Sequence, residues 1–227
     1  KPLSSLEKVF PDETPVYRME CQMLSGLWGE TVSFQVAYTG DFVMRERLDV
    51  RVVSELAEHV HVRTVEMVPV GRATNGIVDD NYLKTTSGLY PDLLKDLKDG
   101  KVIVYSRQWR SLWVDVDITN EIPAGEYEIE LQLIKEGEVV CSAKQKVTVI
   151  GTELPKLDIM HTEWMHADCL ADYYHVEVFS EEHWKLLENY FQEYVKRDCN
   201  MMLTPLFTSP LDTAIGLERT TCQLIDV

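Results

Sequence analysis

Apolar and polar residues alternate at every second position over most of the first two thirds of the chain. In 111–118 the even-numbered positions are Leu, Val, Val and Ile, and the positions between them include Trp113, Asp115 and Asp117. Strict alternation predicts a strand with one face in a core. The same pattern predicts strands at 16–23, 30–38, 48–56, 60–70, 101–105, 126–134 and 139–150. Short strands at spacings of roughly ten residues are typical of a sandwich, so 1–152 is predicted to be an immunoglobulin-like β-sandwich domain.

Some segments depart from this alternation. Residues 24–29 interrupt it, and 71–88 is dense in Gly, Asn, Asp, Ser and Thr, which predicts a long loop. A short helix is predicted for Pro91–Lys98, because a proline suits the first helical position and a glycine follows the end. Residues 135–138 predict the tip of a β-hairpin.

The pattern becomes helical after Gly151–Pro155, which we interpret as a short linker between two domains. Residues 180–199 are predicted to form an amphipathic helix with Ser180 as its N-cap. Acidic residues follow the cap and basic residues fill the last turn, as the helix dipole favours. The predicted apolar face consists of Trp184, Leu187, Phe191 and Tyr194.

This helix lies between short apolar runs. Strands are predicted at 157–161 and 201–203, with polar loops at 162–179 and 204–219 and a third apolar run at 221–227. Strand, helix and buried strand in this order predict a right-handed βαβ unit. Residues 153–227 are therefore predicted to be the opening of a truncated (β/α)₈ barrel, whose complete form needs about 200–250 residues.

Charge and cysteine content narrow the possible partners. The chain has 22 basic and 38 acidic residues, a net charge of −16, which disfavours nucleic acid as a partner. No run approaches the ~20 apolar residues that cross a membrane. The five cysteines form no C-x-x-C pair, so we predict no metal site and no cofactor. Free thiols favour a reducing compartment, and we expect the cytoplasm of a bacterial cell.

Two groups of motifs resemble the bacterial proteins of domain of unknown function 4091, relatives of the family 123 glycoside hydrolases. The first group is SLWVDV at 111–116 and IPAGEYEIEL at 122–131. The second is EWMHADCLA at 163–171, FSEEHW at 179–184 and NMMLTPLFTSPLDT at 200–213. The resemblance implies an N-terminal sandwich and a catalytic (β/α)₈ barrel that acts on glycosides.

The resemblance also implies a reaction. Family 123 members are β-N-acetylgalactosaminidases that work by substrate assistance with an adjacent Asp–Glu pair. No Asp-Glu dipeptide follows the linker in this sequence. The catalytic residues are therefore expected beyond Val227, and the fragment by itself is expected to be inactive.

Polar and aromatic residues in the two predicted loops are the candidates for substrate binding. Carboxylates bind sugar hydroxyls, and Trp or Tyr rings stack on sugar faces. The predicted substrate-binding residues are Glu163, Trp164, His166, Asp168, Thr208, Asp212 and Arg219. An alternative interpretation is that His166 and Asp168 cap the loop while Arg219 makes a structural ion pair.

Two further interpretations stay open at this point. One is a non-catalytic carbohydrate-binding or interaction sandwich, in which Trp28, Trp109 and Trp113 form a stacking platform or pack internally. The other concerns assembly: unfinished strand edges and the Trp184 face favour a homo-oligomer formed through the αβ segment. A carbohydrate remains the expected ligand of the whole protein.

Overall fold

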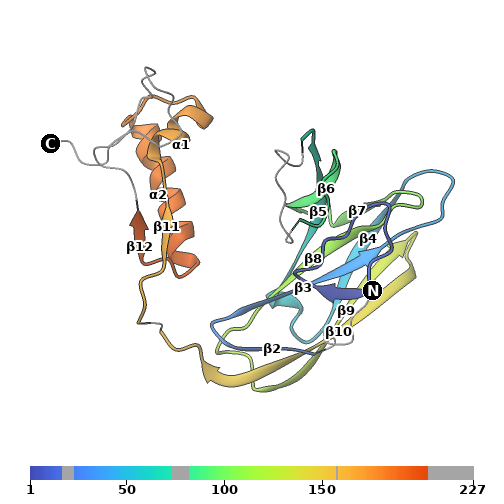
Figure 1. The fold of residues 1–227 in the computed structure, drawn as a ribbon. Helices are drawn as coiled ribbons and strands as arrows, with labels where there is room; N and C mark the ends of the chain where they lie inside the picture. The colour runs from blue at the N-terminus through green and yellow to red at the C-terminus, as the bar shows by residue number, and fades with distance from the viewer. Residues whose placement is uncertain (17–22, 73–81, 157, 204–227) are drawn as a thin grey trace. The chain divides into compact units, whose positions relative to one another are not determined.

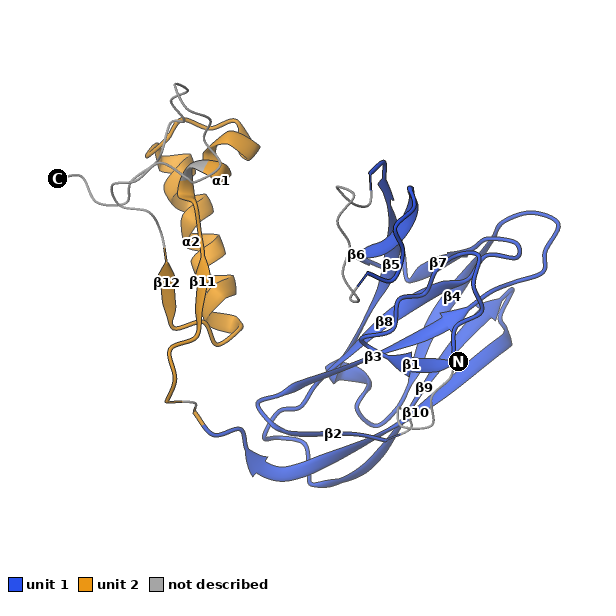
Figure 2. Ribbon diagram, in the orientation of Figure 1, with its two compact units in different colours: residues 1–155 blue, residues 156–227 orange. Residues whose placement is uncertain are grey.

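A computed structural model describes residues 1–16, 23–72, 82–156 and 158–203 (Figure 1). Strands predominate, so the prediction of a mainly β protein is confirmed. The chain divides into two compact units, unit 1 at Lys1–Pro155 and unit 2 at Lys156–Val227 (Figure 2). Within the described ranges, no helix has the length and apolar character needed to cross a membrane.

Unit 1 consists of two five-stranded sheets. The first sheet has the order β1 (Pro2–Ser4), β3 (Thr31–Tyr38), β8 (Arg110–Asp117), β5 (Val60–Val70) and β6 (Gly88–Asp96). The second sheet has the order β2 (Met23–Trp28), β10 (Glu138–Glu153), β9 (Gly125–Lys135), β4 (Glu46–Val53) and β7 (Lys101–Val104). A 3-10 turn at Ala57–His59 joins β4 to β5. Neighbouring strands are antiparallel except β2 and β10, which are parallel.

The two sheets share one hydrophobic core. Leu112, Val114 and Val116 of β8 are completely buried, and Ile129 of β9 and Val147 of β10 meet them from the second sheet. The even-numbered apolar positions of β8 enter this core, as the alternation predicts, because successive strand side chains point to opposite faces; Ser111 and Asp115 on the other face are also buried. The odd-numbered positions of β8 therefore lie on the outer face of the first sheet.

Three predictions for unit 1 are wrong. The predicted linker Gly151–Pro155 is strand over its first three residues, because β10 continues to Glu153. Pro91–Lys98 is not a helix, because 88–96 forms β6 at the edge of the first sheet. An edge strand tolerates a proline, and Met67 pairs with Pro91 next to a shift in register between β5 and β6. Residues 24–29 do not interrupt a strand: Met23–Trp28 is β2, and its pairing with distant β10 is invisible to local patterns.

Unit 2 contains a parallel strand pair joined by two helices. Its elements are β11 (Thr162–Trp164), α1 (Ala167–Tyr174), α2 (Glu181–Lys196) and β12 (Met201–Leu203). Parallel pairing of β11 with β12 confirms the predicted βαβ connection. The first strand, however, lies at 162–164 rather than 157–161, and most of the predicted loop at 162–179 is strand and helix.

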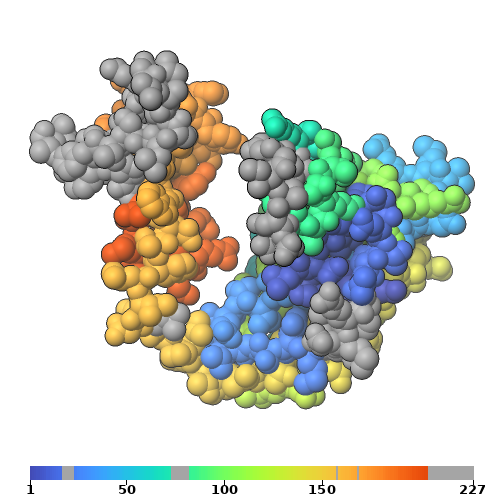
Figure 3. Space-filling model, viewed as in Figure 1, coloured from blue at the N-terminus to red at the C-terminus, as the bar shows by residue number. Residues whose placement is uncertain are grey.

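One face of this small sheet packs on the helices. Met165 belongs to one buried cluster with Leu187 of α2, which is completely buried, and Met202 packs against this cluster. On the other face Trp164 is 70% exposed, and Met201 and Leu203 are about 40% exposed. The space-filling view shows β11 and β12 reaching the surface of unit 2 (Figure 3). Among the described residues, the sheet face opposite α2 is therefore apolar and exposed, so the burial expected for 201–203 on both faces is not observed.

Helix α2 starts where the sequence predicts. The Ser180 hydroxyl accepts a hydrogen bond from the backbone N–H of His183 at 3.2 Å, and Glu181 and Glu182 follow it. The predicted face is correct for Leu187, which is buried, and for Phe191, which packs against the core, but His183 is buried in place of Trp184, which is 43% exposed.

Loss of the Ser180 cap has a defined expected effect. Ser180→Ala removes one acceptor for the first turn of α2 and is expected to lower stability by about 1 kcal/mol. Ser180→Asp, which keeps an acceptor, is the matched control and is expected to retain stability. Urea unfolding followed by the helical signal in circular dichroism measures both variants. Equal midpoints for Ser180→Ala and the unchanged protein would contradict the role of the cap.

Candidate functional site

Polar and aromatic residues follow β11 at its carboxyl end, where β/α proteins place ligand sites. Trp164 is the last residue of the strand, and the next backbone N–H, of Met165, donates to the carbonyl oxygen of Leu203 at 2.8 Å. His166 then occupies the N-cap position of α1 without a side-chain capping bond. The structure thus places Trp164 and His166 together at this end of the strand, and Asp168 in the first turn of α1.

Glu163 points to the opposite face of the sheet from Trp164. It pairs in register with Met202, which packs toward α2. Burial, and to a smaller degree the Glu163 carboxylate, raises the pKa of the Tyr194 phenol on α2. Glu163 therefore lies on the helix side of the strand and separates from Trp164, although the two were predicted to share one site. Strand alternation produces this separation, because 163 is in β11 and not in a loop.

Thr208, Asp212 and Arg219 lie outside the described residues, as does the predicted third run at 221–227. The chain leaves β12 at Leu203, which is paired with Trp164.

The other end of the strand pair is closed by Asn200. Its side-chain oxygen accepts from the His161 backbone N–H at 3.0 Å, and its side-chain nitrogen donates to the Ile159 carbonyl at 2.9 Å. Cys199 Sγ lies 3.8 Å from both ring nitrogens of His161. In the parts of the chain that the structure describes, no three His, Cys, Asp or Glu side chains gather in a way that suits a metal ion. We interpret this end as structural.

His183 was not among the sequence candidates, yet it is completely buried. Its Nδ1 accepts from the Phe179 backbone N–H at 2.9 Å, which leaves Nε2–H to donate to the Ala167 carbonyl at 2.9 Å. One side chain thus joins the start of α1 to the start of α2. The sequence does not predict that His183 is buried, because the predicted apolar face of the helix includes its neighbour Trp184 and not His183.

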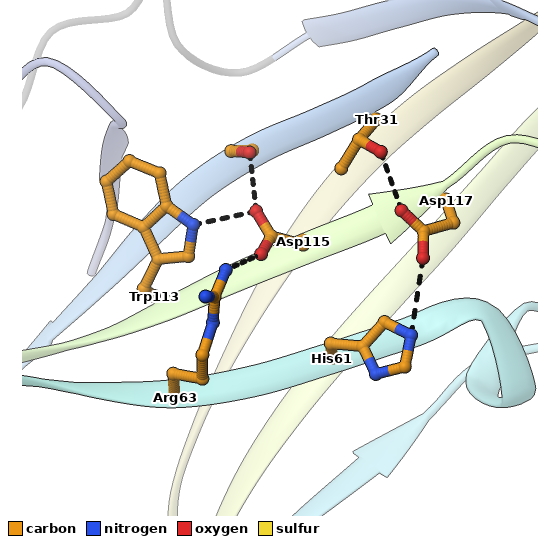
Figure 4. Close-up of polar contacts among 7 residues, drawn as sticks. Thr31, His61, Arg63, Trp113, Asp115 and Asp117 are labelled. Atoms are coloured by element: carbon orange, nitrogen blue, oxygen red, sulfur yellow. Dashed lines mark hydrogen bonds and ion pairs between the residues drawn. The ribbon is translucent and has the colours of Figure 1, made fainter. Parts of the chain in front are cut away.

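Unit 1 carries a second polar cluster on the outer face of the first sheet, centred on Asp115 (Figure 4). One carboxylate oxygen of Asp115 accepts from the Ser33 hydroxyl at 2.6 Å and from Trp113 Nε1–H at 2.7 Å. The other accepts from the Arg63 guanidinium. Asp115 is only 9% exposed, so these partners from β3, β5 and β8 satisfy a nearly buried charge.

A second and more exposed set of contacts, centred on Asp117, lies next to the Asp115 cluster on the same face of the sheet. Asp117 accepts from the Thr31 hydroxyl at 2.6 Å, and its other oxygen is 3.3 Å from His61 Nε2 (Figure 4). Both sets of contacts link the same three strands: Thr31 and Ser33 of β3 are directly opposite Asp117 and Asp115 of β8, whereas His61 and Arg63 of β5 reach these carboxylates diagonally. Because their members bond mainly to one another, we interpret both sets as links that hold the strands together.

The three tryptophans proposed as a stacking platform are engaged separately. Trp28 packs on the core and donates its indole N–H to the Ile122 carbonyl at 2.9 Å. Trp109 packs against the cluster of Leu3, Val9 and Ala37. Trp113 donates to Asp115 as described. These contacts account for all three rings through packing and hydrogen bonding.

Comparison with known proteins singles out the same part of the chain. Residues 164–227 match the family model of the glycoside hydrolase 123 catalytic domain. The match begins at Trp164, at the carboxyl end of β11. No curated protein matches the sequence.

Solved structures extend the likeness to the fold of most of the chain. A family 123 glycoside hydrolase from Clostridium perfringens, studied for glycolipid glycan hydrolysis, aligns with a TM-score of 0.59 and 15% identity. The alignment covers 79% of this chain and 32% of that one, so the chain spans about a third of the length of that enzyme.

Two further structures are more distant. The N-terminal domain of PorA aligns with a TM-score of 0.27 and 9% identity over 64% of this chain and 98% of that chain. AvmM, which catalyses macrocyclization in alchivemycin A biosynthesis, aligns with a TM-score of 0.30 and 13% identity over 61% of this chain and 87% of that chain. Both scores are too low to support a conclusion.

Proposed function

We propose that this chain is part of a glycoside hydrolase that acts on a carbohydrate, with N-acetylated sugars as the first class to test. The observation that carries the proposal is the family-model match to a glycoside hydrolase 123 catalytic domain over 164–227. The shared fold with a family 123 enzyme supports it. We further infer that unit 1 is an immunoglobulin-like sandwich and that unit 2 opens a (β/α)₈ barrel.

The described residues suit a substrate-binding role better than a catalytic one. Trp164 is 70% exposed, which leaves its ring free to stack on a sugar face. His166 lies two residues further on, with no side-chain bond to the helix that it caps. Most glycoside hydrolases use a pair of carboxyl groups, and in the substrate-assisted variant an acetamido group of the substrate replaces the protein nucleophile. We propose that this pair lies beyond Val227 and that 1–227 alone is inactive.

The test uses protein expressed from the complete reading frame and a panel of aryl glycosides. We expect hydrolysis of at least one N-acetylated glycoside. Asp168→Asn and Asp212→Asn are each expected to lower kcat/KM by about 10- to 100-fold, because each removes a charge-assisted hydrogen bond to the substrate. Glu188→Gln, an exposed acid on α2, is the matched control and is expected to leave kcat/KM unchanged.

The outcomes separate the proposals. Absence of hydrolysis across the panel would contradict the proposed glycoside hydrolase activity. It would favour the alternative, a non-catalytic carbohydrate-binding or interaction protein. Hydrolysis with unchanged kcat/KM in both Asp variants retains the enzyme and removes Asp168 and Asp212 from its site.

A further inference from the structure

Two exposed aromatic rings stand side by side at the start of α2. The rings of Phe179 and Trp184 have centroids 5.7 Å apart and planes 23° apart, and the two residues are 42% and 43% exposed. Neither residue belongs to the buried core of unit 2, although Val178 beside them packs against it. The side chain of Val178 therefore faces the core, while the ring of the next residue, Phe179, faces the solvent.

This arrangement requires an unfavourable backbone conformation. Phe179 has a φ of +61°, in the left-handed region where a bulky side chain is an outlier and glycine is preferred. Such strain persists only where the surrounding structure holds it, and it concentrates at functional sites. A glycine at 179 removes the strain, so a phenylalanine here implies a use for its ring.

Buried His183 holds the strained residue in place. Its Nδ1 accepts the Phe179 backbone N–H at 2.9 Å, and Ser180 fixes the same turn through the His183 backbone N–H. The opposite ring nitrogen is tied to Ala167 at 2.9 Å, directly after His166. His183 is thus a positioning residue that couples the aromatic pair to the start of α1.

The pair lies on the same side of the βαβ unit as Trp164 and His166. Helix α2 runs back toward the start of β12, so its first residues are at the carboxyl end of β11. Exposed acids at 177, 181 and 182 surround the pair in sequence and disfavour an anionic ligand. Stacked rings with acidic neighbours suit the C–H face and hydroxyls of a neutral sugar.

We propose that Phe179 and Trp184 form an outer subsite that stacks on a neutral sugar ring distant from the bond that is cleaved. The subsite rests on the proposed glycoside hydrolase function and specifies its substrate class: a neutral oligosaccharide rather than a single sugar. His183 sets the position of the Phe179 ring within it.

The experiment compares two substrates of the enzyme expressed from its complete reading frame. One is an aryl glycoside of a single sugar, and the other is a neutral tetrasaccharide with the same terminal sugar. Trp184→Ala is expected to lower kcat/KM for the tetrasaccharide by about 2- to 10-fold, the range for one aromatic stack, and to leave the aryl glycoside unchanged. Val195→Ala, 70% exposed at the other end of α2, is the matched control and should change neither value.

Substitutions at Phe179 and His183 test whether the aromatic pair binds a ligand or only packs within the protein. Phe179→Gly is expected to cause the same selective loss with an unchanged or higher Tm, because it removes both the ring and the strain. His183→Asn keeps an acceptor near the Nδ1 position, whereas His183→Gln keeps a donor near the Nε2 position. The ratio of kcat/KM for the tetrasaccharide to kcat/KM for the aryl glycoside should therefore be closer to that of the unchanged enzyme in His183→Asn than in His183→Gln. A lower Tm with equal loss on both substrates would assign the pair to packing and overturn the subsite.

The subsite is also tested without turnover. Saturation-transfer NMR with the tetrasaccharide should detect binding to the unchanged protein and weaker binding to Trp184→Ala. If no variant hydrolyses either substrate but this difference is found, the proposed reaction fails and the subsite stands. If the unchanged protein hydrolyses the aryl glycoside but Trp184→Ala binds the tetrasaccharide equally well, the subsite fails and the reaction stands.

Discussion

Leu187→Ala is expected to destabilise unit 2 by about 2–5 kcal/mol, the range for removing a completely buried leucine side chain. Leu187 is 0% exposed, and among the described residues of this unit the other buried apolar residues are Met165, Ala167 and Ala171. A core of this size has few neighbours that can move into the cavity. We expect unit 2 to lose its cooperative transition or to unfold at a much lower temperature.

Circular dichroism separates the two units, because the described α-helices belong to unit 2 and the ten strands of the two larger sheets to unit 1. The helical signal should melt early in Leu187→Ala while the strand signal keeps its midpoint. Val195→Ala on the same helix is 70% exposed and should stay within about 0.5 kcal/mol of the unchanged protein. A common midpoint shift for helix and strand signals would mean that the two units unfold together.

Asp115→Ala is expected to cost unit 1 about 2–3 kcal/mol. The substitution leaves the Arg63 guanidinium, the Ser33 hydroxyl and the Trp113 indole N–H without their shared acceptor. Removing one partner of a buried ion pair leaves the other charge uncompensated. We expect a smaller loss of stability than for a fully buried pair, because the Arg63 side chain is 30% exposed and water can partly solvate it.

Asp117→Ala provides the comparison within the same strand. Asp117 also links β3 to β5, but its side chain is 44% exposed and His61 is 64% exposed. Exposed pairs contribute about 0–1 kcal/mol, so this variant should unfold close to the unchanged protein. Urea unfolding followed by strand circular dichroism measures both. Equal destabilisation by the two alanine variants would show that burial does not set the strength of these sets of contacts.

Local rules account for the elements that were predicted correctly. The alternation at 111–118 identified which residues of β8 enter the core, and Ser180 identified the start of α2. Both features depend on residues near each other in the sequence. The turn between β9 and β10 is similar, because Glu136 and Gly137 adopt the positive φ values of a two-residue hairpin.

The errors come from contacts between distant residues. Pro91 satisfies the rules for a helix start and also those for an edge strand, and pairing with β5 decides between them. Strand β11 has no alternation to detect in Thr-Glu-Trp, and its pairing with β12 across two helices defines it.

The candidate site was predictable only in part for the same reason. The sequence predicted that Trp164 and His166 follow a strand, and the structure places both at the carboxyl end of β11, while their role in substrate binding stays a prediction. Glu163 and Trp164 point to opposite faces because the strand lies at 162–164 and not at the predicted 157–161. The burial of His183 depends on its hydrogen bonds to 167 and 179. Those bonds join segments whose proximity the linear sequence does not reveal.

Strand β10 has a mechanical consequence. It lies inside the second sheet, with β9 on one side and β2 in parallel on the other, and its last residues lead to the boundary at Pro155. The Leu154 backbone N–H still donates to the Trp28 carbonyl at 2.8 Å. A force that pulls on unit 2 along this strand loads both hydrogen-bonded ladders in shear, so many bonds must break together. Tension at the junction is therefore resisted by the ladders of β10 to both β2 and β9, and not by the peeling of one ladder bond by bond.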